Sequence, residues 1–218
     1  MSTRSKGWGV AAAACLGLWM IHNGSAQVTP PVPSAAQAFA AGPGVHTDAA
    51  ADPLPPSDPV RLRIPEIDVD APVTGLGIGR DGALDVPTAA DRNLAGWYED
   101  GTRPGAKGTA IVAGHVDNAD GPAVFYALGA LKKGNRVEVD RRDGRTAVFT
   151  IDAVEVYEND AFPDAKVYGQ ADRADIRVIT CGGGFSKKSG GYLGNVVAFG
   201  HLIGVRPEAS LPAGSRTA

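Results

Sequence analysis

The sequence predicts a mainly β fold, a closed or nearly closed β-barrel with a few short helices. From Val60 onward, short apolar runs of strand length follow one another and are broken by Gly, Pro and Asp. Helical periodicity is rare in the same region, and many strands at short intervals are typical of barrels. The chain has 218 residues, 44% of them hydrophobic, which is enough for one ordinary core. We therefore expect one folded domain.

The individual elements follow from the local patterns. Strands are expected at residues 61–64, 71–75, 109–115, 136–139, 146–157, 176–180 and 195–205. A turn is expected near residues 92–97. A short helix is expected over residues 123–131, where Phe125, Leu128 and Leu131 recur at helical spacing.

The N-terminal segment, residues 1–26, is predicted to be a signal or anchor sequence. Arg4 and Lys6 precede the uncharged apolar run 7–21, and a basic flank of this kind keeps the N-terminus in the cytoplasm. Small residues at 24–26 would permit cleavage, whereas tryptophans near both ends of the run favour an uncleaved interfacial anchor. We expect the anchor, which places the rest of the chain outside the cell membrane; a cleaved signal would make the protein secreted.

Composition divides the remainder into three parts. Residues 27–59 hold eight of the sixteen prolines, many alanines and little charge, a composition that does not fold alone. We predict a linker here, which stretched fully at ~3.1 Å per residue could reach on the order of 100 Å. Residues 60–206 form the predicted folded domain, and residues 207–218 a flexible C-terminal tail.

Charge and cysteine content exclude several classes of protein. The net charge is -3, from 21 basic and 24 acidic residues, with no long basic run, so nucleic acid is not an expected partner. The two cysteines, Cys15 and Cys181, leave one thiol in the folded part, which excludes a disulfide scaffold. The four histidines form no close cluster in the sequence, and no metal site is expected.

Cys181 is the first candidate for a catalytic residue. It ends the apolar run Arg177-Val178-Ile179-Thr180 and is followed by three glycines. A structural cysteine would more often lie within an apolar run, whereas a glycine-rich loop leaves room for a peptide backbone to approach. The pattern is therefore consistent with a nucleophile, although a buried packing role remains open.

His115 is the second candidate, because it ends another apolar run, Ala110 to Gly114, where the strand meets a polar loop. Two reactive side chains at strand ends can meet at one rim of a barrel. A histidine near a cysteine can take its proton, or hold the thiolate and then protonate a leaving amine.

These segments carry a family resemblance. Gly114-His115-Val116-Asp117 and Val178 to Gly183 resemble the histidine and cysteine motifs of sortases. The stretches 96–98, 103–108 and 123–128 resemble the class F subgroup. The resemblance covers roughly residues 60–205 in the expected order, and an N-terminal anchor followed by a Pro/Ala linker also fits.

The resemblance implies an eight-stranded barrel and a cysteine transpeptidase that needs no cofactor. Cys181 would cleave a C-terminal sorting signal of the Leu-Pro-x-Thr-Gly kind through an acyl-enzyme thioester. An amine of the peptidoglycan cell wall, or water, would then release the attached secreted protein.

One family feature is missing. Sortases usually place an arginine on the strand after the cysteine loop, but no arginine occurs between Cys181 and Arg206. Leu193 or Asn195 takes that place, and Asn195 is our candidate oxyanion donor, because a side-chain amide can supply such a hydrogen bond. A turn or strand-entry role for Asn195 is equally open.

Other side chains near the motifs have open roles. A cation could come from Arg92, Lys187 or Lys188, although each reads more simply as a surface charge. Asp117 could orient His115 or cap a loop. The aromatic residues of the cysteine loop, Phe185 and Tyr192, could line a peptide pocket or simply pack.

Two other functions remain as alternatives. An L,D-transpeptidase acting on peptidoglycan stems also uses cysteine and histidine, but its motif has a glycine after the histidine and before the cysteine, whereas here Gly114 precedes His115 and Thr180 precedes Cys181. A non-catalytic, sortase-like module that binds peptide tails is suggested by the missing arginine.

Overall fold

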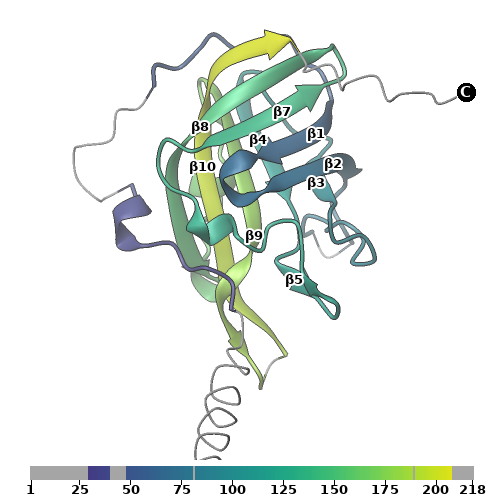
Figure 1. The fold of residues 1–218 in the computed structure, drawn as a ribbon, viewed down its shortest axis with the longest axis vertical. Helices are drawn as coiled ribbons and strands as arrows, with labels where there is room; N and C mark the ends of the chain where they lie inside the picture. The colour runs from purple at the N-terminus through teal and green to yellow at the C-terminus, as the bar shows by residue number, and fades with distance from the viewer. Residues whose placement is uncertain (1–28, 40–47, 81, 189, 208–218) are drawn as a thin grey trace, which may run out of the picture.

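The computed structural model describes residues 29–39, 48–80, 82–188 and 190–207. In these residues eight strands close a barrel in the order β1-β2-β3-β4-β9-β10-β8-β7 (Figure 1). The predicted mainly β, eight-stranded barrel with few helices is thus confirmed. The barrel strands are β1 (Pro59–Ile64), β2 (Val69–Leu76), β3 (Ala95–Tyr98), β4 (Gly108–Ala113), β7 (Arg136–Arg141), β8 (Arg145–Glu158), β9 (Ala174–Ser186) and β10 (Gly191–Pro207).

Short elements complete the described chain. A two-stranded ribbon, β5 (Asp117–Asn118) and β6 (Gly121–Pro122), follows β4 outside the barrel. The helical pieces are η1 (Ala35–Gln37), η2 (Pro65–Ile67), η3 (Leu128–Ala130), η4 (Asn159–Ala161) and α2 (Asp164–Tyr168).

One expectation about local structure was wrong and one was right only in part. The expected helix over 123–131 is a run of turns that ends in the single 3-10 turn η3, although Phe125 and Leu128 are completely buried in the barrel core. The expected turn near 92–97 is present at residues 92–93, but from Ala95 onward the chain forms strand β3, which pairs in parallel with β2. Short buried strands of four residues give little periodicity for a sequence pattern to detect.

Alternation along the strands separates an interior from an outer face. On β9, Ile176 and Val178 lie in the main core, whereas Ile179 belongs to a second apolar cluster on the opposite face of the strand. Val167 of α2 belongs to this second cluster, so the segment between β8 and β9 covers that outer face.

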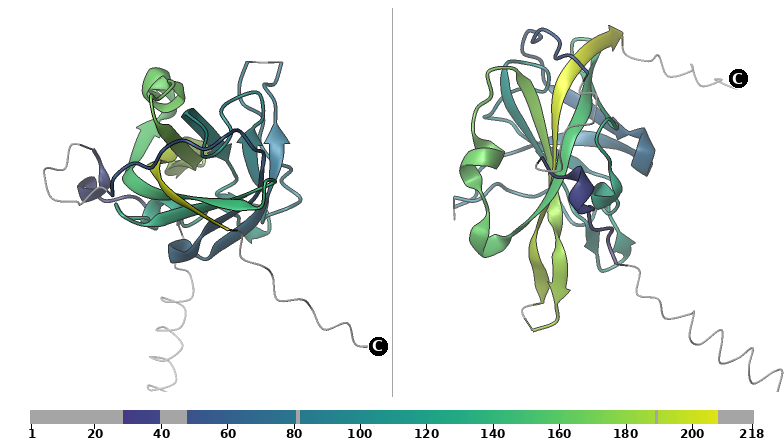
Figure 2. Two further views of the ribbon diagram at one scale, coloured as in Figure 1. Left: turned by 90° about the horizontal axis from the view of Figure 1, so that it is seen from above. Right: turned by 90° about the vertical axis from the view of Figure 1, so that its left-hand side faces the viewer.

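Strands β9 and β10 extend beyond the barrel as a hairpin, seen at the lower end of Figure 1 and again in the right view of Figure 2. The pairing continues as far as Ser186 and Gly191. The glycine-rich loop predicted after Cys181 therefore lies within the hairpin, where Gly182 and Phe185 pair with β10 and the register shifts between them.

Part of the region predicted to be a linker lies against the barrel. Ala51 donates a backbone hydrogen bond of 2.8 Å to Leu202, and Leu54 donates one of 2.8 Å to Gly105. Phe39 packs edge-on against Phe199, with ring centroids 5.1 Å apart. Residues 29–39 and 48–59 thus follow the surface of the barrel.

No helix in the described part of the chain is both long and apolar enough to span a membrane. The predicted anchor, residues 1–26, lies outside the described residues, as does almost all of the predicted tail.

Candidate active site

Cys181 sits in the part of β9 that leads into the hairpin, directly opposite Asn195 of β10. The glycines after it are required by the backbone. Gly183 and Gly184 have φ values of 73° and 93°, in the left-handed region that glycine occupies most easily. A Cβ on Gly182 would lie 2.6 Å from a methyl group of Val196. The glycine run therefore shapes the hairpin beside the thiol.

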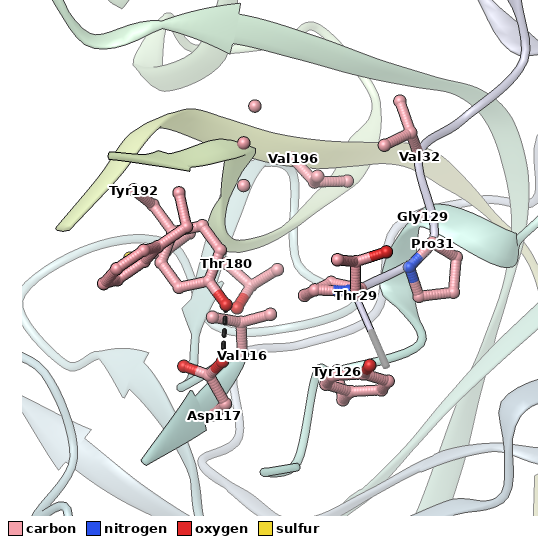
Figure 3. A pocket seen from close by; sticks show the side chains of 16 residues that line it. Thr29, Pro31, Val32, Val116, Asp117, Tyr126, Gly129, Thr180, Tyr192 and Val196 are labelled. Carbon is pink, nitrogen blue, oxygen red and sulfur yellow. Dashed lines mark hydrogen bonds between the residues drawn. The ribbon is translucent and has the colours of Figure 1, made fainter. Parts of the chain in front are cut away.

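A cavity of about 480 Å³ opens beside Cys181 (Figure 3). Its walls come from four parts of the chain: residues 29–32, four residues of the segment 116–129, residues 180–185, and two residues of β10. None of the described residues that line it is lysine, arginine or histidine. The thiol thus borders a space that is large enough for part of a peptide and has no cation among the described residues of its walls.

The surroundings of Cys181 favour the neutral thiol. Desolvation by neighbouring atoms raises the pKa of Cys181, the negative charge of Asp117 raises it further, and a hydrogen bond from its own backbone N–H opposes both effects. The residue is nevertheless exposed to solvent. A base is therefore needed to produce the thiolate at neutral pH.

Asp117 accepts a hydrogen bond from the hydroxyl of Tyr192, drawn as the dashed line in Figure 3. Burial and the adjacent carboxylate raise the pKa of Tyr192 strongly, so this phenol remains protonated. Phe185, opposite Tyr192 on the hairpin, packs edge-on with it at 5.4 Å between ring centroids. Both predicted pocket aromatics therefore line the cavity.

His115 lies two residues beyond the end of β4. Strands β4 and β9 pair in parallel up to Ala113 and Ile179, Gly114 donates its backbone N–H to Ile179, and Thr180 donates its hydroxyl to the Gly114 carbonyl. His115 and Cys181 are each two residues further along their chains than the Ala113–Ile179 pair.

The imidazole of His115 has one identified partner. Its Nε2 lies 2.7 Å from the backbone oxygen of Pro87. A carbonyl oxygen only accepts, so Nε2 carries the proton and donates, which leaves Nδ1 as the proton acceptor of the neutral ring. His115 is not among the residues that line the cavity.

Asn195 faces Cys181 in register, but it does not line the cavity. Its side-chain amide donates a hydrogen bond of 3.0 Å to Asn159 in η4. This hydrogen bond uses one of the two N–H groups of the Asn195 amide. Its role as oxyanion donor stays a prediction.

The alternative sources of a cation lie elsewhere. Arg92 donates to the carbonyl of Asp120 at 3.0 Å. Lys187 and Lys188 lie in the exposed turn at the tip of the hairpin. Leu193, the other residue at the expected arginine position, forms a bulge between β9 and β10 and is 51% exposed.

Two features of the cavity had no signal in the sequence. The segment Thr29 to Val32, assigned to a linker by composition, lines the cavity with Cys181. Tyr126, noted only within a family-like stretch, also lines it, and its hydroxyl is buried without a hydrogen-bond partner in the described residues. Only the three-dimensional arrangement brings these residues to the thiol.

The fold and the sequence both point to one family of enzymes. Residues 62–203 match the family model described as Sortase domain. Similar solved structures include sortase A from Listeria monocytogenes, with 20% identity, a TM-score of 0.53, and coverage of 70% of this chain and 92% of that chain. A lid mutant of sortase A from Corynebacterium diphtheriae has 19% identity and a TM-score of 0.51, covering 72% of this chain and 74% of that chain.

Sortase C-1 from Actinomyces oris has 20% identity and a TM-score of 0.51, with coverage of 67% and 76%. At these identities the structural likeness supports the barrel fold alone. A search among curated proteins gave no match.

The match to the Sortase domain model indicates a transpeptidase of the sortase type. The family match covers well over half of the chain, and the chain belongs to the sortase family.

Proposed function

We propose that this sortase is an extracytoplasmic cysteine transpeptidase that joins secreted proteins to the cell wall. Cys181 attacks a Leu-Pro-x-Thr-Gly-like sorting signal, and an amine of peptidoglycan receives the protein. The observation that carries this assignment is the placement of Cys181 on a cavity of about 480 Å³, with His115 two residues beyond the last β4–β9 pair and Cys181 two residues beyond it on the other strand. The family-like stretches 96–98, 103–108 and 123–128 support class F.

The reaction follows from the two side chains. His115 takes the proton of the thiol through Nδ1, and the sulfur bonds to the threonine carbonyl carbon as the C=O electrons move onto oxygen. When the carbonyl re-forms, the C–N bond breaks and the proton passes to the leaving glycine nitrogen. An amine then attacks the thioester and loses a proton to His115, the C–S bond breaks as the new amide bond forms, and the proton returns from His115 to the cysteine sulfur.

The raised pKa of Cys181 gives His115 a defined task in this scheme. At neutral pH the thiol is protonated, so the resting site contains little thiolate. Proton removal must accompany attack, which a neighbouring imidazole can provide. The proposal includes no cofactor.

The proposed location is the cell membrane, with residues 1–26 as the anchor and the barrel outside. The basic flank and apolar run of that segment support it. Fractionation of cells, followed by protease treatment of intact cells, tests this location. Recovery of the protein in the cytosol would contradict it.

The activity is tested with the full-length protein and a fluorogenic Leu-Pro-x-Thr-Gly peptide, with and without an added amine. We expect cleavage, transfer to the amine, and a thioester on Cys181 detectable by mass spectrometry. Cys181→Ala should abolish both products, and His115→Ala should lower turnover by at least ~100-fold. Unchanged turnover in Cys181→Ala would refute the proposal.

The cation-free cavity wall favours one competing function, a sortase-like module that binds peptides without cleaving them. The same assay distinguishes the two. Tight binding of the peptide with no thioester supports the binding module, whereas muropeptide cross-links without peptide cleavage support an L,D-transpeptidase.

A further inference from the structure

Acyl transfer to a cysteine needs a hydrogen-bond donor for the carbonyl oxygen, and this site lacks the usual one. The sulfur's attack moves an electron pair onto that oxygen, and a donor placed there in advance lowers the barrier. The chain contains no arginine between Cys181 and Arg206, and no cation lines the cavity in the part of the chain that the structure describes. Asn195 lies outside the cavity wall, with its amide bonded to Asn159.

The Tyr126 hydroxyl differs from the hydroxyls of Tyr192 and Thr180, which line the same cavity. The hydroxyls of Tyr192 and Thr180 donate to Asp117 and to the Gly114 carbonyl, respectively. The Tyr126 hydroxyl is buried and has no partner in the described part of the chain. A buried hydroxyl without a hydrogen bond costs free energy. A bound ligand that accepts a hydrogen bond from this hydroxyl would remove that cost.

Tyr126 lines the same cavity as Cys181. It follows the β5–β6 ribbon, and its backbone N–H donates to Ala123 at 3.0 Å, which fixes the turn that carries it. In the view of Figure 3, it lies across Val116 from the Tyr192–Asp117 pair. Residues Thr29 to Val32 share this cavity, so a peptide must displace them or lie beside them.

The electrostatic setting keeps Tyr126 a donor. Burial and the charge of Asp117 both raise the pKa of Tyr126, and a phenol that stays protonated can donate to an oxygen that gains charge. The pKa of Tyr192 is also raised, but the Tyr192 hydroxyl already donates its hydrogen bond to Asp117.

We infer that the Tyr126 hydroxyl donates a hydrogen bond to the carbonyl oxygen of the acyl group as Cys181 attacks it. The role rests on the proposed acyl-transfer function and takes the place of the absent arginine. No proton is transferred: the sulfur–carbon bond forms, the oxygen accepts the hydrogen bond, and the hydrogen bond weakens when the carbonyl re-forms and the C–N bond breaks.

The test compares two reactions of Cys181 in the full-length protein. Acylation by p-nitrophenyl acetate passes through a tetrahedral oxyanion, whereas alkylation by iodoacetamide does not. Both rates are measured by mass spectrometry at Cys181, with Cys181→Ala as the background. Tyr168→Phe, which removes the hydroxyl of an exposed tyrosine on α2 outside the cavity, is the matched control.

We expect Tyr126→Phe to lower acylation by at least ~10-fold and to leave alkylation within about twofold, because one oxyanion donor contributes this much or more. Its melting temperature should be unchanged or higher, since the lost hydroxyl has no protein partner. Tyr168→Phe should alter neither rate. Acylation of Tyr126→Phe within about twofold of wild type, or an equal fall in both rates, would overturn the inference.

The sorting peptide supplies a separate arm. If wild-type protein fails to cleave it while ester acylation still depends on Tyr126, the proposed substrate is wrong and the role of Tyr126 stands. If Asn195→Ala loses acylation and Tyr126→Phe does not, Asn195 is the donor and Tyr126 is excluded.

Discussion

Asn195 lies directly opposite Cys181 across the β9–β10 pair, and its side chain bonds to Asn159 rather than to any atom of the cysteine. Asn159 in turn donates a hydrogen bond of 3.0 Å to the Tyr192 carbonyl. The two asparagines therefore connect the cysteine hairpin to the segment that follows β8.

This connection predicts a coupled effect on stability. Asn195→Ala should lower the free energy of unfolding by about 1 kcal/mol, and Asn159→Ala by somewhat more because it loses two hydrogen bonds. The double variant should cost less than the sum of the single variants. Urea unfolding of the four proteins measures the coupling. Additivity within about 0.3 kcal/mol would show that the two side chains act independently.

Alkylation of Cys181 should depend steeply on pH. Its raised pKa means that the thiolate fraction, and hence the iodoacetamide rate, is low at pH 7 and still increases above pH ~8.5, where an ordinary cysteine is half ionised. Asp117→Asn removes a negative charge and should shift the profile to lower pH. A rate that levels off below pH 7 would contradict the raised pKa.

Gly129 controls how the segment Thr29 to Val32 sits in the cavity. A Cβ at Gly129 would lie 2.0 Å from the Pro31 carbonyl oxygen, so Gly129→Ala must move this segment. We expect a bulky maleimide to modify Cys181 several-fold faster in that variant. Gly204→Ala is the control, because a Cβ there meets no atom within 4 Å. Equal rates in the two variants would mean that the segment does not limit access.

The fully buried side chain of Arg141 contacts Asp143, and we expect this contact to be sensitive to acid. Arg141 donates to Pro104 at 2.6 Å and to Asp143 at 2.9 Å, and its hydrogen bond, together with Arg145, lowers the pKa of Asp143 to about 2. A carboxylate with a lowered folded-state pKa adds stability above its unfolded pKa, near 4, and loses it as the pH falls toward 2.

We expect Asp143→Asn to lower the free energy of unfolding by about 1 kcal/mol at pH 6, after allowance for solvent screening, and to have a clearly smaller effect near pH 2. Denaturant unfolding across this pH range measures it. An equal loss at both pH values would indicate a packing effect instead of the ion pair.

The sequence could predict the barrel because its strands are long enough for apolar patterns to show, as at 146–157 within β8. It could not predict that the chain after Cys181 remains paired, because glycines at 182–184 suggest a loop whatever their partners. The spacing of Phe125, Leu128 and Leu131 suited a helix, yet burial of turns produces the same spacing. Tyr126 and Thr29 became site residues only through contacts distant in sequence.

Because Thr29 lines the cavity, the expected distance between the barrel and the membrane changes. A free linker over 27–59 would let the barrel move on the order of 100 Å from the membrane. Instead, residues 29–39 and 48–59 follow the barrel surface, and Thr29 comes three residues after the end of the predicted anchor. With that anchor in a bilayer, three residues can separate Thr29 from the end of the anchor by at most roughly 10 Å. The membrane surface would then form one side of the cavity entrance, and substrates would reach the cavity as they emerge from the membrane.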